Sequence, residues 1–495
     1  MAIRTLEELT IDEVHDSYTR GAYNAELLVE AYQKRIYQLD RDDNGPRLNA
    51  TLAWNPEALT EAKKLDDELK ARRKLVGPLH GIPIVVKDTV QVKGLITTFG
   101  SVLAKDFVSK QDSSVVKRLR DAGAIILAKT SMPDFGTDYF STSTINGRVR
   151  NPYDLDRDTG GSSSGTAAAI AANMAVVGLG GDSSGSIRIP SAMCNLVGLR
   201  PTVGLISASG ILSGIAGQAT LGPMTRTVRD AAIMMDALVG FDPADINTGI
   251  QKQSTLPVGG SFTAQLGQQH VSTMRLGVIR AYFGDKSDAE QQGVNIVIDE
   301  TLGVLRTAGC KLIDIDIPNL EKYLESTNMM LPRSKADLND FITPTLGTTI
   351  NEIVEKGNFP KENVMLPFVA ANGATSPYGS GSYGRQVDKR DEFQLVVMSA
   401  MCEANVSALV FPTNKLPAPR YDDIDMKTRA YFPTNTGFAS CLRFPSISVP
   451  VGFTTTSGMP VGLEVVGVPL SDQLLLNVSY AIEQVVKGRR APKLT

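Results

Sequence analysis

Histidine and cysteine, the side chains most used to hold metals or to act as general bases, are rare in this chain. The 495 residues include three histidines, none paired with another at the spacing of a metal site. The four cysteines are widely separated and form no CxxC pair. We therefore expect reduced thiols, no disulfides and no metal centre.

Strong net charge and long hydrophobic runs are also absent. The formal net charge is -3, which argues against a general surface for nucleic acids or anionic membranes. The longest apolar run, residues 167–181, is shorter than the roughly 20 residues of a membrane helix and contains Asn173. The first residues lack the hydrophobic segment of a signal peptide. We expect a cytoplasmic protein.

What the chain does contain is a segment rich in glycine and serine. Residues 160–222 hold thirteen glycines and ten serines but only three charged residues. So little charge indicates burial. Glycine lets backbone N–H groups approach a ligand closely, and buried serine hydroxyls need hydrogen-bond partners. This combination indicates a catalytic floor made of hydroxyls and backbone amides.

The order of apolar runs predicts an α/β fold. Short β-branched runs end in lysine at two places and are separated by a helical pattern, which is typical of a parallel strand–helix–strand unit. The same scheme recurs later in the chain. We expect one domain over residues 1–495 with a variable excursion at about 240–400 that shapes the substrate site. The expected strands are 82–86, 124–128, 176–179, 276–279, 311–317, 408–411 and 446–451, with helices at 113–122, 166–173 and 287–307.

The run from Gly160 to Thr166 allows three interpretations. A phosphate-binding loop needs a lysine before Thr166, where Gly165 stands. A nucleophile elbow centred on Ser163 needs a histidine further along the chain, and only His270 follows. The third interpretation is a turn whose serines cap the alanine-rich helix. Taken alone, the motif favours this structural interpretation.

Two other features change that balance. Lys87 ends a strand that should be buried on both faces, although lysine is almost never fully buried without a partner. Ser186 follows Ser162 by twenty-four residues, in a second run of glycine and serine. A serine needs a base to act as a nucleophile, and histidine is too scarce here to supply one.

Together these runs resemble the signature of the amidase signature family, and the resemblance covers roughly residues 25–485. It implies an α/β fold with a large mixed, mostly parallel twisted central sheet covered by helices on both faces. It also implies an enzyme without a cofactor. The matching segments are Gly77–Pro83 with Lys87–Asp88, Gly160–Gly165, Asp182 with Gly185–Pro190, Gly198–Thr202, Gly222–Met224, Val449–Gly452 and Pro460–Leu463.

The family uses a Ser–Ser–Lys triad, so the resemblance implies three catalytic residues. Lys87 would be the base, Ser162 the bridging serine after a cis peptide bond, and Ser186 the nucleophile. The physical logic agrees with these roles. Burial disfavours the charged form of lysine, and lowering its pKa from about 10.4 to about 7 or 8 is within reach of burial.

The resemblance also implies the surroundings of the nucleophile. Backbone N–H groups of Ser183, Ser184, Gly185 and Ser186 would form the oxyanion hole. Asp182 and Arg188 would support this loop as a buried polar pair. The chain departs from the usual family pattern in having Gly181 in place of threonine and Ser184 in place of glycine.

Substrate contacts are predicted after the second strand. By resemblance, the segment Met132, Pro133, Asp134 and Phe135 would line the acyl pocket, although an ordinary strand-to-helix connection explains it equally well. Phe341 and Phe368 could wall the pocket or belong to the core. No motif chooses between them.

The sequence thus predicts an amidase that hydrolyses an amide or carbamate C–N bond of a small molecule through an acyl-enzyme, similar to peptide amidases, aryl acylamidases and carbamate-cleaving relatives. The alternative is the transamidating subunit of a tRNA-dependent amidotransferase, and a third possibility is a non-catalytic binding protein. We expect the partners to be a small amide or carbamate and water, without nucleic acid or membrane. A homodimer is left open.

Overall fold

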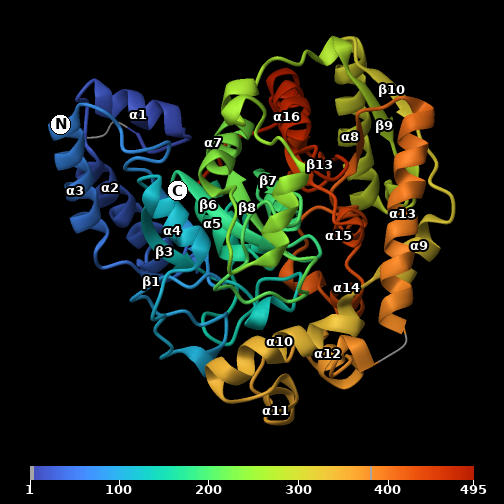
Figure 1. Cartoon of the computed structure of the whole chain (residues 1–495), viewed down its shortest axis with the longest axis horizontal. Coiled ribbons are helices and arrows are strands. Elements are labelled where there is room, and N and C mark those ends of the chain that lie inside the picture. Colours follow the sequence, from blue (N-terminus) through green and yellow to red (C-terminus); the bar gives the residue numbers. More distant parts are fainter. Residues whose placement is uncertain (1–4, 380–381, 495) are drawn as a thin grey trace.

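A computed structural model describes residues 5–379 and 382–494 (Figure 1). Its centre is an eleven-stranded sheet in the order β1-β3-β2-β6-β8-β7-β12-β13-β11-β9-β10. The strands are β1 (Thr51–Trp54), β2 (Pro83–Lys87), β3 (Ile125–Thr130), β6 (Val177–Asp182), β7 (Val197–Arg200), β8 (Thr220–Thr225), β9 (Arg275–Val278), β10 (Lys311–Asp314), β11 (Ala408–Pro412), β12 (Ser446–Phe453) and β13 (Pro460–Val466).

Helices cover both faces of this sheet, and the expected α/β class is confirmed. A two-stranded ribbon, β4 (Arg150–Asn151) with β5 (Asp154–Asp158), lies apart from it. The helices are α1 (Ile11–Thr19), α2 (Ala25–Ile36), α3 (Ala58–Arg72), α4 (Ser114–Asp121), α5 (Ser164–Ala171), α6 (Arg188–Met193), α7 (Val228–Leu238), α8 (Ala289–Thr307), α9 (Leu320–Thr327), α10 (Met330–Leu346), α11 (Ile350–Glu355), α12 (Met365–Asn372), α13 (Ser382–Ala404), α14 (Met426–Ala430), α15 (Gly437–Leu442) and α16 (Asp472–Val486).

The edge strand β1 pairs antiparallel with β3, and beyond it the pairing differs between the outer and the central strands of the sheet. β3, β2 and β6 are parallel, as are β11, β9 and β10. The strands between them, from β6 through β8, β7, β12 and β13 to β11, pair antiparallel. Each parallel end contains one of the strand–helix–strand units expected from the sequence.

The part of the sheet that matters for the site is β2 beside β6. Every residue of β2 is buried, as expected for a parallel strand covered on both faces. Helix α5 packs against both strands. It approaches β6 so closely that a Cβ at Gly178 would lie 2.5 Å from Cγ2 of Thr166. The carboxyl ends of β2 and β6 thereby bring Lys87 close to the start of α5.

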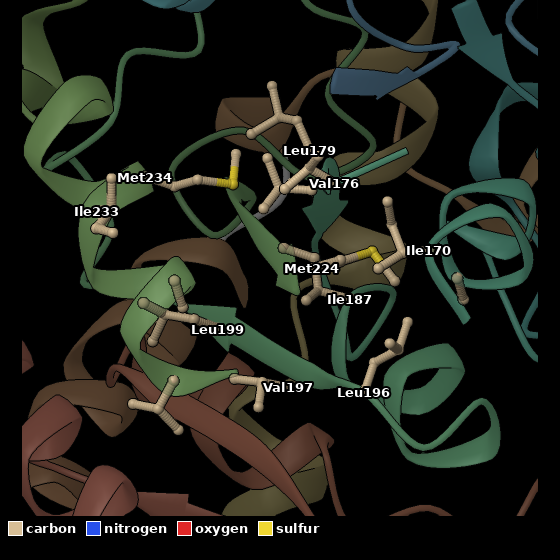
Figure 2. Close-up of a cluster of buried hydrophobic side chains, with 14 of the residues drawn as sticks. Ile170, Val176, Leu179, Ile187, Leu196, Val197, Leu199, Met224, Ile233 and Met234 are labelled. Carbon is tan, nitrogen blue, oxygen red and sulfur yellow. The ribbon is translucent and has the colours of Figure 1, made fainter. Parts of the chain in front are cut away.

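Apolar side chains fix these elements in place. Figure 2 shows Leu179 of β6, Met224 of β8 and Ile187 just before α6 within the same group of buried side chains. Ile170 of α5 belongs to the same core. The loop between β6 and α6 is therefore anchored to the hydrophobic core on each side.

Residues 240–400 do not form a separate layer. Their strands β9 and β10 extend the main sheet, and α8 packs against β12 and β13. Helices α10, α11 and α12 gather at one side of the molecule (Figure 1). Leu338, Leu366 and Val369 from this group pack with Phe99 and Phe135. That the region varies among relatives stays a prediction.

Across the residues that the structure describes, no helix is both long and apolar enough to cross a membrane.

Candidate active site

Lys87 lies at the end of β2 with its amine directed into the protein. Its side chain is 2 % exposed, and Nζ donates hydrogen bonds to Ser162 Oγ at 2.7 Å and to the Gly181 carbonyl at 3.1 Å. Burial lowers the pKa of Lys87 to about 7, against a smaller opposing effect of Asp182. This amine can therefore be neutral near pH 7 and accept a proton.

The two serines stand on the same side of the sheet as Lys87. Ser162 lies two residues before the first residue of α5 and follows a cis peptide bond from Gly161. Ser186 is 7 % exposed, lies before α6, and lines one small cavity with Lys87 and Ser162. The Ser163 N–H donates to the Ser186 carbonyl at 3.1 Å, which ties the two turns together. The described residues show no hydrogen bond between the hydroxyls of Ser162 and Ser186.

The loop 183–186 is held by partners on several sides. The Gly185 N–H donates to Asp182 Oδ1 at 2.8 Å, so it is not available to an oxyanion. This corrects the expectation that included Gly185 among four donors. Its cause is the neighbouring carboxylate, which turns that amide away from the cavity. For Ser183, Ser184 and Ser186, the described residues provide no acceptor to their N–H groups.

Gly185 occupies its position because nothing larger fits there. Its φ is +121°, and a Cβ would lie 2.1 Å from Oγ1 of Thr436. That same hydroxyl donates to the Ser184 carbonyl at 2.9 Å. On the other side, Gln218 Nε2 donates to the Ser183 carbonyl at 2.9 Å. Two consecutive peptide carbonyls of the loop thus accept hydrogen bonds from side chains outside the loop.

Asp182 and Arg188 form the buried pair expected from the sequence, within a larger network. Arg188 Nε lies 3.0 Å from Asp182 Oδ2, and Arg200 Nη1 lies 3.2 Å from Oδ1. Burial alone would raise the pKa of Asp182, yet these two guanidinium groups hold it well below its usual range. Arg188 also pairs with Glu464. The two arginines therefore keep the Asp182 carboxylate ionised beneath the nucleophile loop.

Only one of the four predicted substrate contacts lines the pocket in front of Ser186. Phe135 does so, whereas Met132, Pro133 and Asp134 do not. Asp134 is fully buried, and its carboxylate accepts hydrogen bonds from the Thr144 N–H at 2.8 Å and the Thr144 hydroxyl at 2.6 Å. These three residues are buried and do not line this pocket, so Phe135 alone remains a proposed substrate contact.

The two phenylalanines considered as pocket walls also lie outside this pocket. Phe341 packs edge-on against Phe99, with ring centroids 5.2 Å apart. Phe368 is 44 % exposed and lines a neighbouring surface cavity.

The pocket itself is small and mainly apolar. Its volume is about 80 Å³. It shares Phe135, Gly136, Ser183 and Ser186 with the small cavity that Lys87 and Ser162 line. Among its described lining residues the only Asp, Glu, Lys or Arg is Asp138, whose carboxyl lies 3.3 Å from Arg429 Nη1 and whose pKa burial raises to about 7. The remaining wall comes from Thr137, Tyr139, Gly214, Ile215, Met330, Ser334, Leu338, Met365 and Val369.

Sequence reasoning missed the residues that hold the nucleophile loop from outside its motif. Arg200 lies in a segment that carried the resemblance and could have been suspected from its burial. Gln218 lies within the glycine- and serine-rich segment and Glu464 directly follows Pro460–Leu463, whereas Thr436 stands in a segment without a recognisable signal. Only the fold brings all three to the loop. No group of three or more potential metal ligands occurs among the described residues.

The family model and the similar solved structures agree on the family of this chain. The family model described as Amidase matches residues 27–476. Among solved structures, the native peptide amidase from Stenotrophomonas maltophilia is 32% identical, with a TM-score of 0.85, and covers 98% of this chain and 99% of that chain. The A-subunit of glutamyl-tRNA(Gln) amidotransferase from Thermotoga maritima, at 24% identity, has a TM-score of 0.76, covers 100% of both chains and supports the fold alone.

The curated relatives carry a different name from that peptide amidase. A chain from Symbiobacterium thermophilum, named as the A-subunit of glutamyl-tRNA(Gln) amidotransferase, is 31% identical over 97% of this chain and 97% of its own. Its counterpart in Bdellovibrio bacteriovorus is 29% identical over 97% and 98%. These names contradict our expectation of a small-molecule substrate without nucleic acid, because the relatives are named as subunits of an amidotransferase for glutamyl-tRNA(Gln). With its family model spanning most of its length, the chain belongs to the amidase family and is an amidase-signature enzyme that acts on C–N bonds.

Proposed function

We propose that this enzyme cleaves an amide C–N bond through an acyl-enzyme on Ser186, with Lys87 as the base and Ser162 as the proton relay. The observation that carries the proposal is the buried Lys87 amine, 2.7 Å from Ser162 Oγ, with its pKa lowered to about 7. A neutral amine in that position can take the Ser162 proton while Ser162 takes the proton of Ser186.

In the first half of the reaction, Ser186 Oγ attacks the carbonyl carbon and its proton passes through Ser162 to Lys87. The N–H groups of Ser183, Ser184 and Ser186 would stabilise the oxyanion. When the tetrahedral intermediate collapses, the C–N bond breaks and the proton returns along the same path to the leaving nitrogen. Water then attacks the ester with the same relay as base. The hydroxyl contact between Ser162 and Ser186 would form when substrate binds, since such contacts are often loose without it.

The pocket lining supports an uncharged substrate group next to the scissile carbonyl. A charged group buried without a partner is costly, and Asp138 is already paired with Arg429. The apolar side chains of α10 and α12 suit an aliphatic or aromatic group. Anilides, C-terminal peptide amides and carbamates therefore serve as probes of this pocket, and they are tested beside glutamine.

A second candidate is the amide-hydrolysing subunit of a tRNA-dependent amidotransferase. The names of the curated relatives favour this function over free-standing hydrolysis. It would use the same triad, but it would need partner subunits and a glutamine side-chain amide as the ammonia donor. The apolar pocket provides little for the two charges of free glutamine, and this is the observation against it.

One experiment separates the two functions. Purified enzyme is assayed with an anilide, a peptide amide, a primary aliphatic amide, a carbamate and glutamine, beside Ser186→Ala. Turnover of an apolar amide by the isolated chain supports hydrolysis. Glutamine turnover that appears only with co-purified subunits supports the amidotransferase. A fluorophosphonate that fails to label Ser186 of active enzyme would refute the acyl-enzyme in either case.

A further inference from the structure

A second cavity lies behind the wall of the active-site pocket and is lined by arginines. Its volume is about 550 Å³, within the range of small-molecule sites. Ala216 and Gly217 line this cavity, whereas the preceding Gly214 and Ile215 line the active-site pocket. A single stretch of chain therefore separates the two spaces.

Three arginines line this cavity, and they differ in their partners. Arg333 forms a bidentate ion pair with Asp337, with distances of 2.9 and 2.7 Å. Arg390 and Arg443 have no carboxylate within ion-pair distance in the described part of the chain. The Nε atoms of both are buried without any hydrogen-bond partner there. Asp391 also lines the cavity but is exposed and forms no ion pair with the described residues.

Leaving these two guanidinium groups unpaired is costly. Arg390 is 8 % exposed, and burial lowers its pKa, with Arg443 acting in the same direction. Burial likewise lowers the pKa of the half-buried Arg443, and the Asp391 carboxylate opposes this only in part. Arginine cannot escape this cost by losing its proton, because its pKa is too high. An anion in the cavity would supply the missing acceptors. The planar fork of arginine matches a carboxylate or a phosphate.

Arg390 is also connected to the nucleophile loop. Its Nη2 donates to Gln218 Oε1 at 2.8 Å, and Gln218 Nε2 donates to the Ser183 carbonyl at 2.9 Å. The Ser183 carbonyl and the Ser184 N–H belong to one planar peptide group, so fixing the first orients the second. Gln218 thereby acts as a positioning residue for one donor of the proposed oxyanion hole.

We propose that this cavity binds a small anion bearing a carboxylate or phosphate group on Arg390 and Arg443, and that the bound anion raises turnover by fixing Gln218 against the nucleophile loop. The proposal that an anion binds depends only on the cavity. The proposal that the bound anion raises turnover rests on the proposed function. Each is tested by its own experiment.

Binding is tested by titrating full-length enzyme with inorganic phosphate and, separately, with citrate, against chloride at equal ionic strength. Calorimetry and the thermal midpoint are the readouts. We expect one of the two anions to bind and raise the midpoint. Arg443→Met should weaken binding at least about tenfold, since a charge-assisted hydrogen bond is lost. The exposed Arg306→Met is the matched control and should bind as wild type. No binding of either anion, or equal binding by Arg443→Met, overturns the site.

Coupling is tested with the best amide substrate. Saturating anion should raise kcat of the wild type with little change in KM. Gln218→Leu should keep anion binding, lower kcat by about tenfold and abolish the response to anion. Gln218→Glu serves as a second variant if the first does not fold. If the anion binds but kcat does not rise, the coupling is refuted while the binding site is still supported. Absence of any amide turnover instead refutes the proposed function, because the binding readout does not depend on it.

Discussion

At the scale of single residues, Lys87 determines what this site can do. It is a lysine at a strand end that forms no ion pair with the described residues, in contrast to Lys129 on the neighbouring strand, which pairs with Asp88 at 2.8 Å. Burial lowers the pKa of both lysines, but the Asp88 carboxylate opposes this effect at Lys129, whereas the pKa of Lys87 falls to about 7. This difference in partners separates a base from a core ion pair.

Replacing the Lys87 amine should abolish turnover without unfolding the enzyme. We expect Lys87→Met to lower kcat by about 10²–10⁴-fold, the usual contribution of a general base. Steady-state kinetics and circular dichroism check this. Lys117→Met, on the exposed surface of α4, is the control and should change neither. A folded Lys87→Met enzyme with normal kcat would contradict the proposed mechanism.

The pH–rate profile should report the same amine. Only neutral Lys87 can accept the proton, so kcat/KM should rise with pH through about 7 and fall tenfold per unit below it. The profile is measured between pH 5 and pH 9, a window of about two units on each side of that value. A rate that stays constant from acid pH upward would mean that another group is the base.

The contribution of Lys87 to stability should also rise with pH. The unfolded chain keeps the Lys87 proton up to about pH 10.5, whereas the folded chain loses it near pH 7. Lys87 therefore lowers the free energy of unfolding by its full amount below pH 7, and this cost shrinks as the pH rises above 7. Lys87→Met removes that cost. We expect the variant to exceed wild type by a few kcal/mol in the free energy of unfolding at pH 6, and by less at pH 9. Denaturant unfolding at the two pH values measures this, and a gain that grows with pH would contradict the lowered pKa.

At the scale of elements, the connection from β6 to α6 is a loop braced from below and from both sides. Asp182 at the end of β6 accepts from the Gly185 and Ile187 N–H groups and from two arginines. Gln218 and Thr436 hold the carbonyls above it. The loop presents its remaining amides because its other polar groups are already engaged.

Removing the Asp182 charge should therefore lower the free energy of unfolding and shift the pH–rate profile. Asp182→Asn leaves Arg200 without its carboxylate partner, and breaking a buried ion pair costs about 3–5 kcal/mol. Because Asp182 raises the pKa of Lys87, its neutralisation should also shift the acid limb of activity to lower pH. Denaturant unfolding and the pH–rate profile are the measurements. A shift of that limb to higher pH would contradict the arrangement.

The helices α10 and α12 should set substrate size. Met365 of α12 is partly buried in the pocket wall, so Met365→Ala enlarges the pocket without opening the core. We expect kcat/KM for a bulky anilide to rise several-fold relative to a primary aliphatic amide, consistent with about 1–3 kcal/mol for a pocket contact. Leu395→Ala, at an exposed position of α13, is the control. Equal effects on both substrates would exclude Met365 from the wall.

At the scale of the whole molecule, strands from early and late parts of the chain share one sheet. The late strands β12 and β13 lie between β7 and β11 and thus join the two parallel ends of the sheet. A fragment of residues 1–240 would expose the edge of β7, which is buried in the intact protein. We expect it to be insoluble or without a cooperative melt, measured beside the full chain by sedimentation and calorimetry. A soluble, cooperatively folding fragment would instead favour two domains.

The sequence predicted those parts of the fold and site that depend on local pattern. The buried strands ending at Lys87 and Lys129 have their own apolar runs, and Ser162 and Ser186 stand in glycine-rich segments that carry a family resemblance. Gln218 and Thr436 could not be found in this way, because their role depends on which segments the sheet brings together. Asp134 does not line the pocket, and no local pattern in the sequence predicts that its carboxylate is buried against Thr144.

The position of Thr436 and Glu464 has a consequence for synthesis. A ribosome that has released residues 1–240 has already supplied the amine and both hydroxyls of the triad, yet Thr436 and Glu464, which brace the loop and Arg188, have still to be made. The nascent polypeptide therefore carries its reactive groups for more than half of translation before they can be aligned. Activity should be acquired late and all at once, after residue 464 has emerged.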